Sequence, residues 1–294
     1  MLSLNMVSSV GYKSANKPND VKLILALLNS YARKEKISSL IPGVTVSDEY
    51  IKLIKIFQNK VIKMNNPDGV VSANLGTFKG LVRYLEGCYT VTSITKPIDG
   101  DLTWEAEGQE GGLYHSRKFH IPSINSGLTI GRGYDMKDQN AVQINNDLVK
   151  SGVDAAASTI ISKAAGKKGN QAELFIIDKD LLDFEISAIT QLKLFNIIYK
   201  ELENDVKRIC RKSDTVLEYG EVDWDNLDKT IKTVLIDLRY RGDYTSSSRM
   251  KIQRHVSNND LIKFKEAINE TANWVGVPDL RKKQRIAYLA KTPN

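Results

Sequence analysis

The chain has 294 residues, of which 41% are apolar and 26% charged, and it carries a formal net charge of +7. This length suits one large globular domain or two smaller ones. The charge predicts attraction to anionic surfaces. No run of Lys or Arg is long enough for a nucleic-acid-binding arm, so nucleic acid is not an expected partner.

The positions of the cysteines and histidines argue against a disulfide scaffold and against a metal site. Cys88 and Cys210 lie far apart, and the three histidines do not show zinc-ligand spacing. We therefore expect no disulfide scaffold, no metal and no cofactor. No apolar run approaches the roughly 18–20 residues of a membrane span, and the first residues lack the features of a signal peptide. The expectation is a protein made in the cytoplasm without a signal peptide and without membrane insertion.

Residues 16–85 predict three helices. Pro18 can open the first, because apolar residues follow it at helical spacing. A second apolar stripe runs from Ile51 to Val61, and a third helix begins at Gly76 after a turn signal at residues 67–69. Residues 86–101 contain glycine and proline around a β-rich stretch at 89–92, which predicts a linker or an entry strand. The predicted domains are residues 1–90 and 91–294.

The second predicted domain is mostly helical. Apolar stripes at helical spacing occur at 142–165, 172–177, 181–209, 227–239, 260–269 and 279–290. One short β segment precedes them. Together with the N-terminal helices, this predicts a mostly helical α+β chain with a small β-hairpin lobe.

The most specific motif is Ser-Gly-Leu-Thr-Ile-Gly-Arg-Gly-Tyr-Asp-Met at residues 126–136. In one straight strand Thr129 and Asp135 would be about 20 Å apart. Two glycines around Arg132 instead favour a three-residue hairpin loop, which pairs Thr129 with Asp135 across two strands. Their side chains would then project from one face and could hold a water between them. An ordinary structural hairpin is the alternative reading.

An acid is predicted just upstream. Residues 104–110 can form a short helix with Thr103 as its cap and Gly111 and Gly112 after its end. Glu107 and Glu110 are three residues apart, so they would share one helical face. The negative end of the helix dipole and partial burial would raise the pKa of a carboxyl at this position, as a general acid needs. Glu110 is the first choice and Glu107 the alternate.

Two resemblances follow from these motifs. Pieces between residues 16 and 78, including Asn-Lys-Pro-Asn-Asp-Val, Ile-Phe-Gln and Pro-Asp-Gly-Val-Val, resemble the peptidoglycan-binding domain found in wall-degrading enzymes. The usual Asp-Gly-x-x-Gly is missing, so the fold is better supported than retained wall binding. The Glu-Gly-Gly and hairpin motifs resemble phage-type lysozymes, and more closely the pesticin-like domains of bacteriocins and of type VI secretion spike (VgrG) extensions. The resemblance to these lysozymes extends over most of residues 102–294.

The lysozyme resemblance implies a role for each motif residue. Glu110 would protonate the leaving glycosidic oxygen, Asp135 would act as the base, and Thr129 would orient the water, giving inversion at the anomeric carbon. Beyond these implied roles, Arg132 at the hairpin tip and Tyr134 beside Asp135 are candidates for contact with the saccharide, with a structural role as the alternative. The implied activity is that of a muramidase cleaving the β-1,4 bond between N-acetylmuramic acid and N-acetylglucosamine. A non-catalytic wall-binding protein is the alternative.

The setting implied is antibacterial. A wall-binding unit followed by a hydrolase suggests an antibacterial effector or a lysis enzyme, delivered by phage lysis machinery or a secretion system. It would act in the periplasm or cell wall of a target or host bacterium. The partners expected are peptidoglycan, an immunity protein, and a secretion spike or chaperone.

Overall fold

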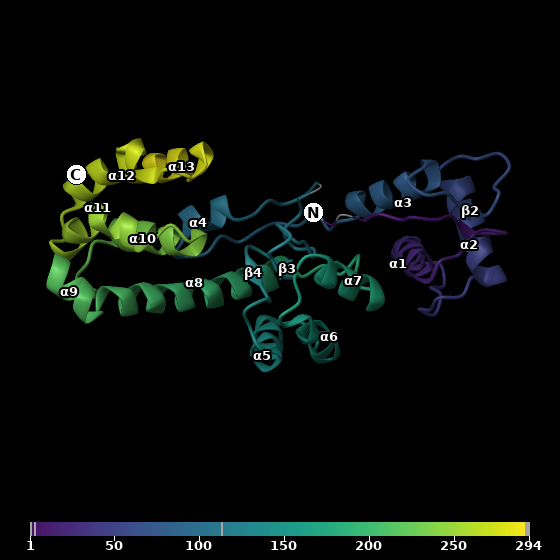
Figure 1. The fold of residues 1–294 in the computed structure, drawn as a ribbon, viewed down its shortest axis with the longest axis horizontal. Coiled ribbons are helices and arrows are strands. Elements are labelled where there is room, and N and C mark those ends of the chain that lie inside the picture. Colours follow the sequence, from purple (N-terminus) through teal and green to yellow (C-terminus); the bar gives the residue numbers. More distant parts are fainter. Residues whose placement is uncertain (1, 3, 113, 292–294) are drawn as a thin grey trace. The chain divides into compact units, whose positions relative to one another are not determined.

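A computed structural model describes residues 2, 4–112 and 114–291. Within these residues the chain forms thirteen α-helices and two antiparallel pairs of two-residue strands (Figure 1). The chain is therefore mostly helical α+β, as predicted. None of the helices in the described ranges is both long enough and apolar enough to cross a membrane.

The elements follow one another along the chain in the order drawn in Figure 1. They are β1 (Val10–Gly11), α1 (Pro18–Lys34), α2 (Asp48–Lys60), β2 (Val70–Val71), α3 (Gly76–Gly87), α4 (Asp101–Ala106), β3 (Thr129–Ile130), β4 (Tyr134–Asp135), α5 (Ala141–Ser151), α6 (Ala155–Ile161), a 3₁₀ turn at Ser162–Ala164, α7 (Asn170–Asp178), α8 (Ala188–Cys210), α9 (Ser213–Tyr219), α10 (Lys229–Arg241), α11 (Ser246–Ser257), α12 (Leu261–Asn269), a 3₁₀ turn at Thr271–Trp274, and α13 (Asp279–Ala290).

The chain divides into two compact units that are each discontinuous in sequence. The first unit comprises residues 1–93 and 109–191, and the second comprises residues 94–108 and 192–294. The predicted domains are continuous in sequence and divide near residue 90. They stay a prediction, because the two units are defined by which residues lie close together in space and not by sequence modules.

The first unit contains the three predicted N-terminal helices. Pro18 stands at the first position of α1, and Ser47 caps α2 by accepting a hydrogen bond from the Tyr50 backbone N–H. Tyr31 on α1 and Phe57 on α2 are both buried and meet edge to face with ring centroids 5.0 Å apart. The apolar periodicity of the sequence therefore identified this core correctly.

In the rest of the first unit, one prediction was wrong in detail, and one choice that the sequence left open is decided. The stripe at 142–165 is not one helix, because Gly152 adopts a φ of +100° and ends α5. Asp154 then caps α6 by accepting from two backbone N–H groups. The β-rich residues 89–92 form no strand and correspond to the linker alternative.

The second unit is built around α10. Helix α4 packs against α10 and α13, and Trp104, Phe195 and Trp274 belong to one buried apolar cluster. The predicted helix at 181–209 begins only at Ala188. Helices α9 and α11 were not predicted, because their serine-rich and polar sequences resemble connections rather than apolar stripes.

Candidate active site

The glycine-flanked motif forms the predicted hairpin. Strands β3 and β4 pair antiparallel, with Thr129 opposite Asp135 and Ile130 opposite Tyr134. Gly131 and Gly133 have φ values of +64° and +91°, in the left-handed region that side chains other than glycine rarely adopt. Residues directly opposite each other in a sheet project side chains to the same face. The hydroxyl of Thr129 and the carboxylate of Asp135 therefore share one face of the hairpin.

The carboxylate of Asp135 is fixed by backbone donors. The Gly127 N–H lies 3.1 Å from Oδ1 and 3.2 Å from Oδ2, and the Lys137 N–H donates to Oδ1 at 2.9 Å. A Cβ at position 127 would lie only 2.4 Å from Asp135 Oδ1. Glycine is therefore needed at position 127 because the carboxylate occupies the space of a side chain.

The hydroxyl of Thr129 is buried and already uses its hydrogen. Its Oγ1 donates to the Gly127 carbonyl at 3.2 Å, and the residue is 2% exposed. A hydroxyl carries one donor and two acceptor lone pairs. Toward a further ligand Thr129 can therefore act as an acceptor in this arrangement.

The hairpin is tied to the segment that follows the glutamates. The backbone N–H of Thr129 donates to the His120 carbonyl, and the His120 N–H donates to the Thr129 carbonyl, each at 2.9 Å. The Gly131 N–H donates to the Ser116 carbonyl at 2.7 Å. These bonds anchor the hairpin and residues 116–120 to each other.

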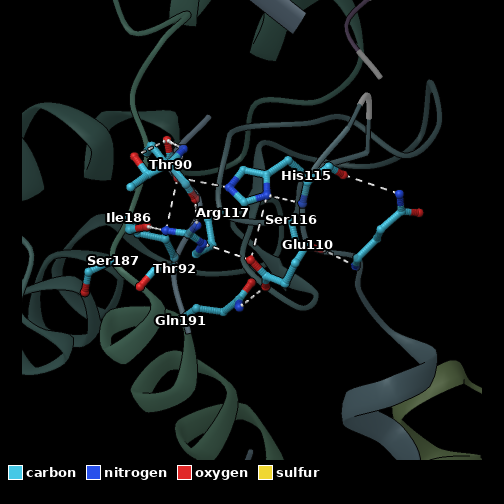
Figure 2. A network of polar contacts seen from close by, with 12 residues as sticks. Thr90, Thr92, Glu110, His115, Ser116, Arg117, Ile186, Ser187 and Gln191 are labelled. Atoms are coloured by element: carbon cyan, nitrogen blue, oxygen red, sulfur yellow. Dashed lines mark hydrogen bonds and ion pairs between the residues drawn. The ribbon is translucent and has the colours of Figure 1, made fainter. Parts of the chain in front are cut away.

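Glu110 lies at the centre of a polar network in the first unit (Figure 2). Its Oε2 accepts from Arg117 Nε at 3.0 Å, and its Oε1 accepts from Gln191 Nε2 at 2.6 Å. Nη2 of Arg132, at the hairpin loop, lies 3.4 Å from Oε1. The side chain of Glu110 is 21% exposed. The carboxyl is thus held firmly while one part of it remains accessible.

Arg117 is itself held by a carboxylate and by backbone carbonyls. Its Nη1 lies 3.0 Å from Glu185 Oε1, and its guanidinium donates to the backbone carbonyls of Ile186 and Thr90. Burial opposes ionisation of Glu185. The hydrogen bonds from His115 and the Thr90 N–H, together with the charge of Arg117, nevertheless hold the pKa of Glu185 below its ordinary value. Arg117 is thereby fixed between two carboxylates.

The contacts of His115 define its tautomer. Its Nδ1 accepts from the Gly111 N–H at 2.8 Å, which leaves Nε2 to donate to Glu185 Oε1 at 3.0 Å. Nδ1 lies 3.8 Å from Glu110 Oε2 but carries no hydrogen in this tautomer. His115 therefore supports the loop around Glu110 and does not form an ion pair with it.

The predicted helix around the glutamates differs from the structure. Helix α4 begins at Asp101, after Gly100 in the left-handed region, and ends at Ala106. Glu107 is its C-cap, whereas Glu110 lies beyond it in a loop, because Ser116 exchanges hydrogen bonds with Gln109 and draws the backbone out of the helix. The helix-dipole argument for Glu110 and the shared helical face were therefore wrong.

Glu107 occupies a different environment in the second unit. Its Oε1 lies 2.9 Å from Arg281 Nη2, and Arg281 also pairs with the fully buried Asp237. Burial raises the pKa of Glu107, with a further upward contribution from Asp237, although the charge of Arg281 works against both. The structure thus places Glu110 in the same unit as the hairpin and Glu107 in the other.

The two predicted saccharide contacts are both buried. Arg132 is 5% exposed and reaches Glu110 as described, while Tyr134 is 1% exposed. The hydroxyl of Tyr134 lies 2.8 Å from both Gln139 Oε1 and Asp147 Oδ2. In the described conformation these residues support the hairpin from within.

Sequence reasoning gave no catalytic or positioning role to Gln191, Glu185 or Arg117. The first two lie about 80 residues downstream of Glu110, where no local spacing connects them to the motif. His115 and Arg117 follow Glu110 closely in the sequence, and this short separation was the one signal that could have indicated their contact with it. Across the described residues, no group of three or more His, Cys, Asp or Glu side chains could hold a metal ion.

Comparison with known families gives one match. A family model described as a domain of unknown function, DUF8812, matches residues 100–286, which is more than half of the chain. The matched residues include both glutamates, the hairpin and the downstream partners of Glu110. No curated protein matches the chain.

Proposed function

The chain belongs to the DUF8812 family, and we propose that it is a peptidoglycan hydrolase of the muramidase type. The observation that carries the proposal is the joining of Glu110 to the Thr129–Asp135 pair within one unit. Backbone bonds and the contact from Arg132 to Glu110 link the two segments. An acid and a water-binding carboxylate on neighbouring segments are the groups that glycoside hydrolysis requires.

The contacts of the hairpin suggest how water would be activated. Both Asp135 and Thr129 are acceptors toward a ligand, so a water between them would donate one hydrogen to each. Its lone pair would then be free to attack the anomeric carbon. The water oxygen bonds to that carbon, its proton passes to Asp135, and Glu110 gives its proton to the departing glycosidic oxygen. Attack from the face opposite the leaving group inverts the anomeric centre.

The substrate class rests on the motif resemblance and on charge. The resemblance to pesticin-like lysozymes favours the β-1,4 bond after N-acetylmuramic acid, and the net charge of +7 favours adhesion to an anionic wall. We propose action in the wall of a target or host bacterium, as an antibacterial effector or lysis enzyme. An immunity protein that covers the site in the producer, and a secretion spike or chaperone, are the partners that fit this role.

The test is the clearing rate of purified sacculi by three matched variants. Glu110→Gln and Asp135→Asn are each expected to lower it at least about a hundredfold, because each removes one proton-transfer group. Glu107→Gln removes the alternate acid and is expected to retain activity. Thermal unfolding of each variant checks that the fold is intact. Normal clearing by folded Glu110→Gln and Asp135→Asn would refute the proposal, and loss only in Glu107→Gln would move the acid to that residue.

One observation favours a non-catalytic wall-binding protein as the second candidate. Both oxygens of Glu110 accept hydrogen bonds from the protein itself, as a purely structural carboxylate would. Co-sedimentation of wild type with sacculi, with no fragments released into solution, is the result that would select this candidate.

A further inference from the structure

Gln191 makes the shortest contact to Glu110. It lies in the first turn of α8, where its backbone N–H donates to the Ser187 carbonyl at 2.9 Å. Its side-chain Nε2 donates to Glu110 Oε1 at 2.6 Å (Figure 2), and the residue is 0% exposed. Ser187 caps this turn by accepting from the Thr190 N–H at 3.0 Å. The amide is therefore presented to Glu110 from a fixed backbone.

The other end of the same amide lacks a hydrogen bond. Gln191 Oε1 is buried, and no donor among the described residues reaches it. A buried acceptor without a partner is unfavourable and uncommon in native structures. This suggests that the arrangement of the amide serves one state of the site and that a second state uses the oxygen.

The chemistry of Glu110 supplies such a second state. An ionised carboxylate only accepts hydrogen bonds, whereas a protonated carboxylic acid donates one through its O–H. The two ends of a glutamine amide have nearly the same shape, and rotation by half a turn exchanges the NH₂ group for the oxygen. Nε2 facing Glu110 fits the ionised form, and Oε1 facing Glu110 fits the protonated form.

The other groups around Glu110 cannot make this exchange. Arg117 and Arg132 carry only donors, and Arg117 is fixed by Glu185 and two backbone carbonyls. His115 faces Glu110 with Nδ1, which is occupied by the Gly111 N–H. Of the side chains that contact this carboxyl in the described structure, the Gln191 amide alone offers both a donor and an acceptor.

We propose that Gln191 is a positioning residue that turns its amide over when Glu110 takes up a proton, accepts the new O–H, and so holds the protonated carboxyl in place until a substrate oxygen replaces the amide as its acceptor. The acid role of Glu110 rests on the proposed function. The amide exchange itself is a property of the folded chain. It requires no bound substrate.

The direct test is the side-chain amide resonance of Gln191 in the ¹³C,¹⁵N-labelled 294-residue chain across a pH titration. The signal is expected to shift in step with the carboxyl ¹³C resonance of Glu110 and to stop responding in Glu110→Gln. Gln253 is the matched control, because it is equally buried and bonds to Tyr244 and Cys210. Its amide is expected to stay constant over the same acidic range. A Gln191 signal that ignores protonation of Glu110 would overturn the inference.

A variant tests the positioning role, and the amide resonance separates this inference from the proposed function. Gln191→Met keeps the side-chain length and removes both hydrogen-bonding ends. It is expected to lower kcat for sacculus hydrolysis about tenfold to a hundredfold with little change in KM. A folded Gln191→Met with wild-type kcat would contradict the positioning role. If wild type releases no fragments while the amide still follows Glu110, the muramidase proposal fails and the amide exchange stands.

Discussion

Gly127 determines where the carboxylate of Asp135 can lie. The glycine donates its N–H to both carboxylate oxygens and leaves the space that they fill. Gly127→Ala would place a methyl group against Oδ1, and the chain can relieve the overlap only by moving Asp135 or the hairpin. We expect a loss of about 1–3 kcal/mol in the free energy of unfolding, together with loss of sacculus clearing. Denaturant unfolding and turbidity measure the two effects.

The control for this prediction is Gly76→Ala. A Cβ at Gly76, the first residue of α3, would meet no atom within 4 Å. This variant is expected to keep both stability and clearing activity. Equal behaviour of the two variants would show that the contact between Gly127 and Asp135 is unimportant.

His120 predicts how stability depends on pH. Burial lowers the pKa of His120 below the ordinary histidine value, although a carbonyl contact from its own segment and the charge of Asp135 work in the opposite direction. The unfolded chain therefore takes up this proton at a higher pH than the folded chain. As pH falls through about 6.5, the unfolded state binds more protons, and the contribution of His120 to stability is lost.

The prediction is tested by unfolding His120→Gln between pH 8 and pH 5. The variant removes the titrating group, so its free energy of unfolding should fall less steeply with acid than that of wild type. The difference between the two proteins at pH 8, where both side chains are neutral, reports the lost packing alone. Parallel curves over the whole range would contradict the assignment.

At the scale of elements, one buried carboxylate joins three helices of the second unit. Asp237 on α10 accepts from Thr103 on α4, and it pairs with Arg281 and Arg285 on α13. Its side chain is 0% exposed. Removing one partner of a buried ionic cluster leaves the remaining charges without compensation. The contacts of Asp237 therefore hold α4, α10 and α13 together.

Asp237→Ala is expected to lower the free energy of unfolding by about 3–5 kcal/mol. Asp279→Ala on the same helix as the arginines is the control, because its side chain is 85% exposed and pairs with the neighbouring Lys282 at the surface. That change should stay within about 0.5 kcal/mol. Guanidinium unfolding monitored by tryptophan fluorescence compares them. A small effect at Asp237 would mean that the apolar contacts alone hold the helices.

The elements also show which features local sequence can predict. The hairpin register followed from two glycines around Arg132, because turn chemistry acts over a few residues. The end of α4 could not be predicted from the local sequence. Gln109 leaves the helix to pair with Ser116, a contact that helix propensity cannot represent. Local signals therefore placed Asp135 correctly and the backbone of Glu110 incorrectly.

At the scale of the whole molecule, the sequence predicted a mostly helical α+β chain from apolar periodicity. It could not predict the contacts that surround the site, since Glu185 and Gln191 come from a distant segment with no pattern linking it to Glu110. The position of Arg117 between the carboxylates of Glu110 and Glu185 likewise arises only when the chain folds. Long-range packing, rather than local propensity, creates the environment of the acid.

We propose that this chain cuts glycan at N-acetylmuramic acid with Glu110 as the acid. The most direct measurement is mass analysis of the fragments that wild type and Glu110→Gln release from purified sacculi. We expect disaccharide muropeptides with N-acetylmuramic acid at each new reducing end from wild type, and none from the variant. Release of the same fragments by both proteins, or fragments cut in the peptide, would contradict it.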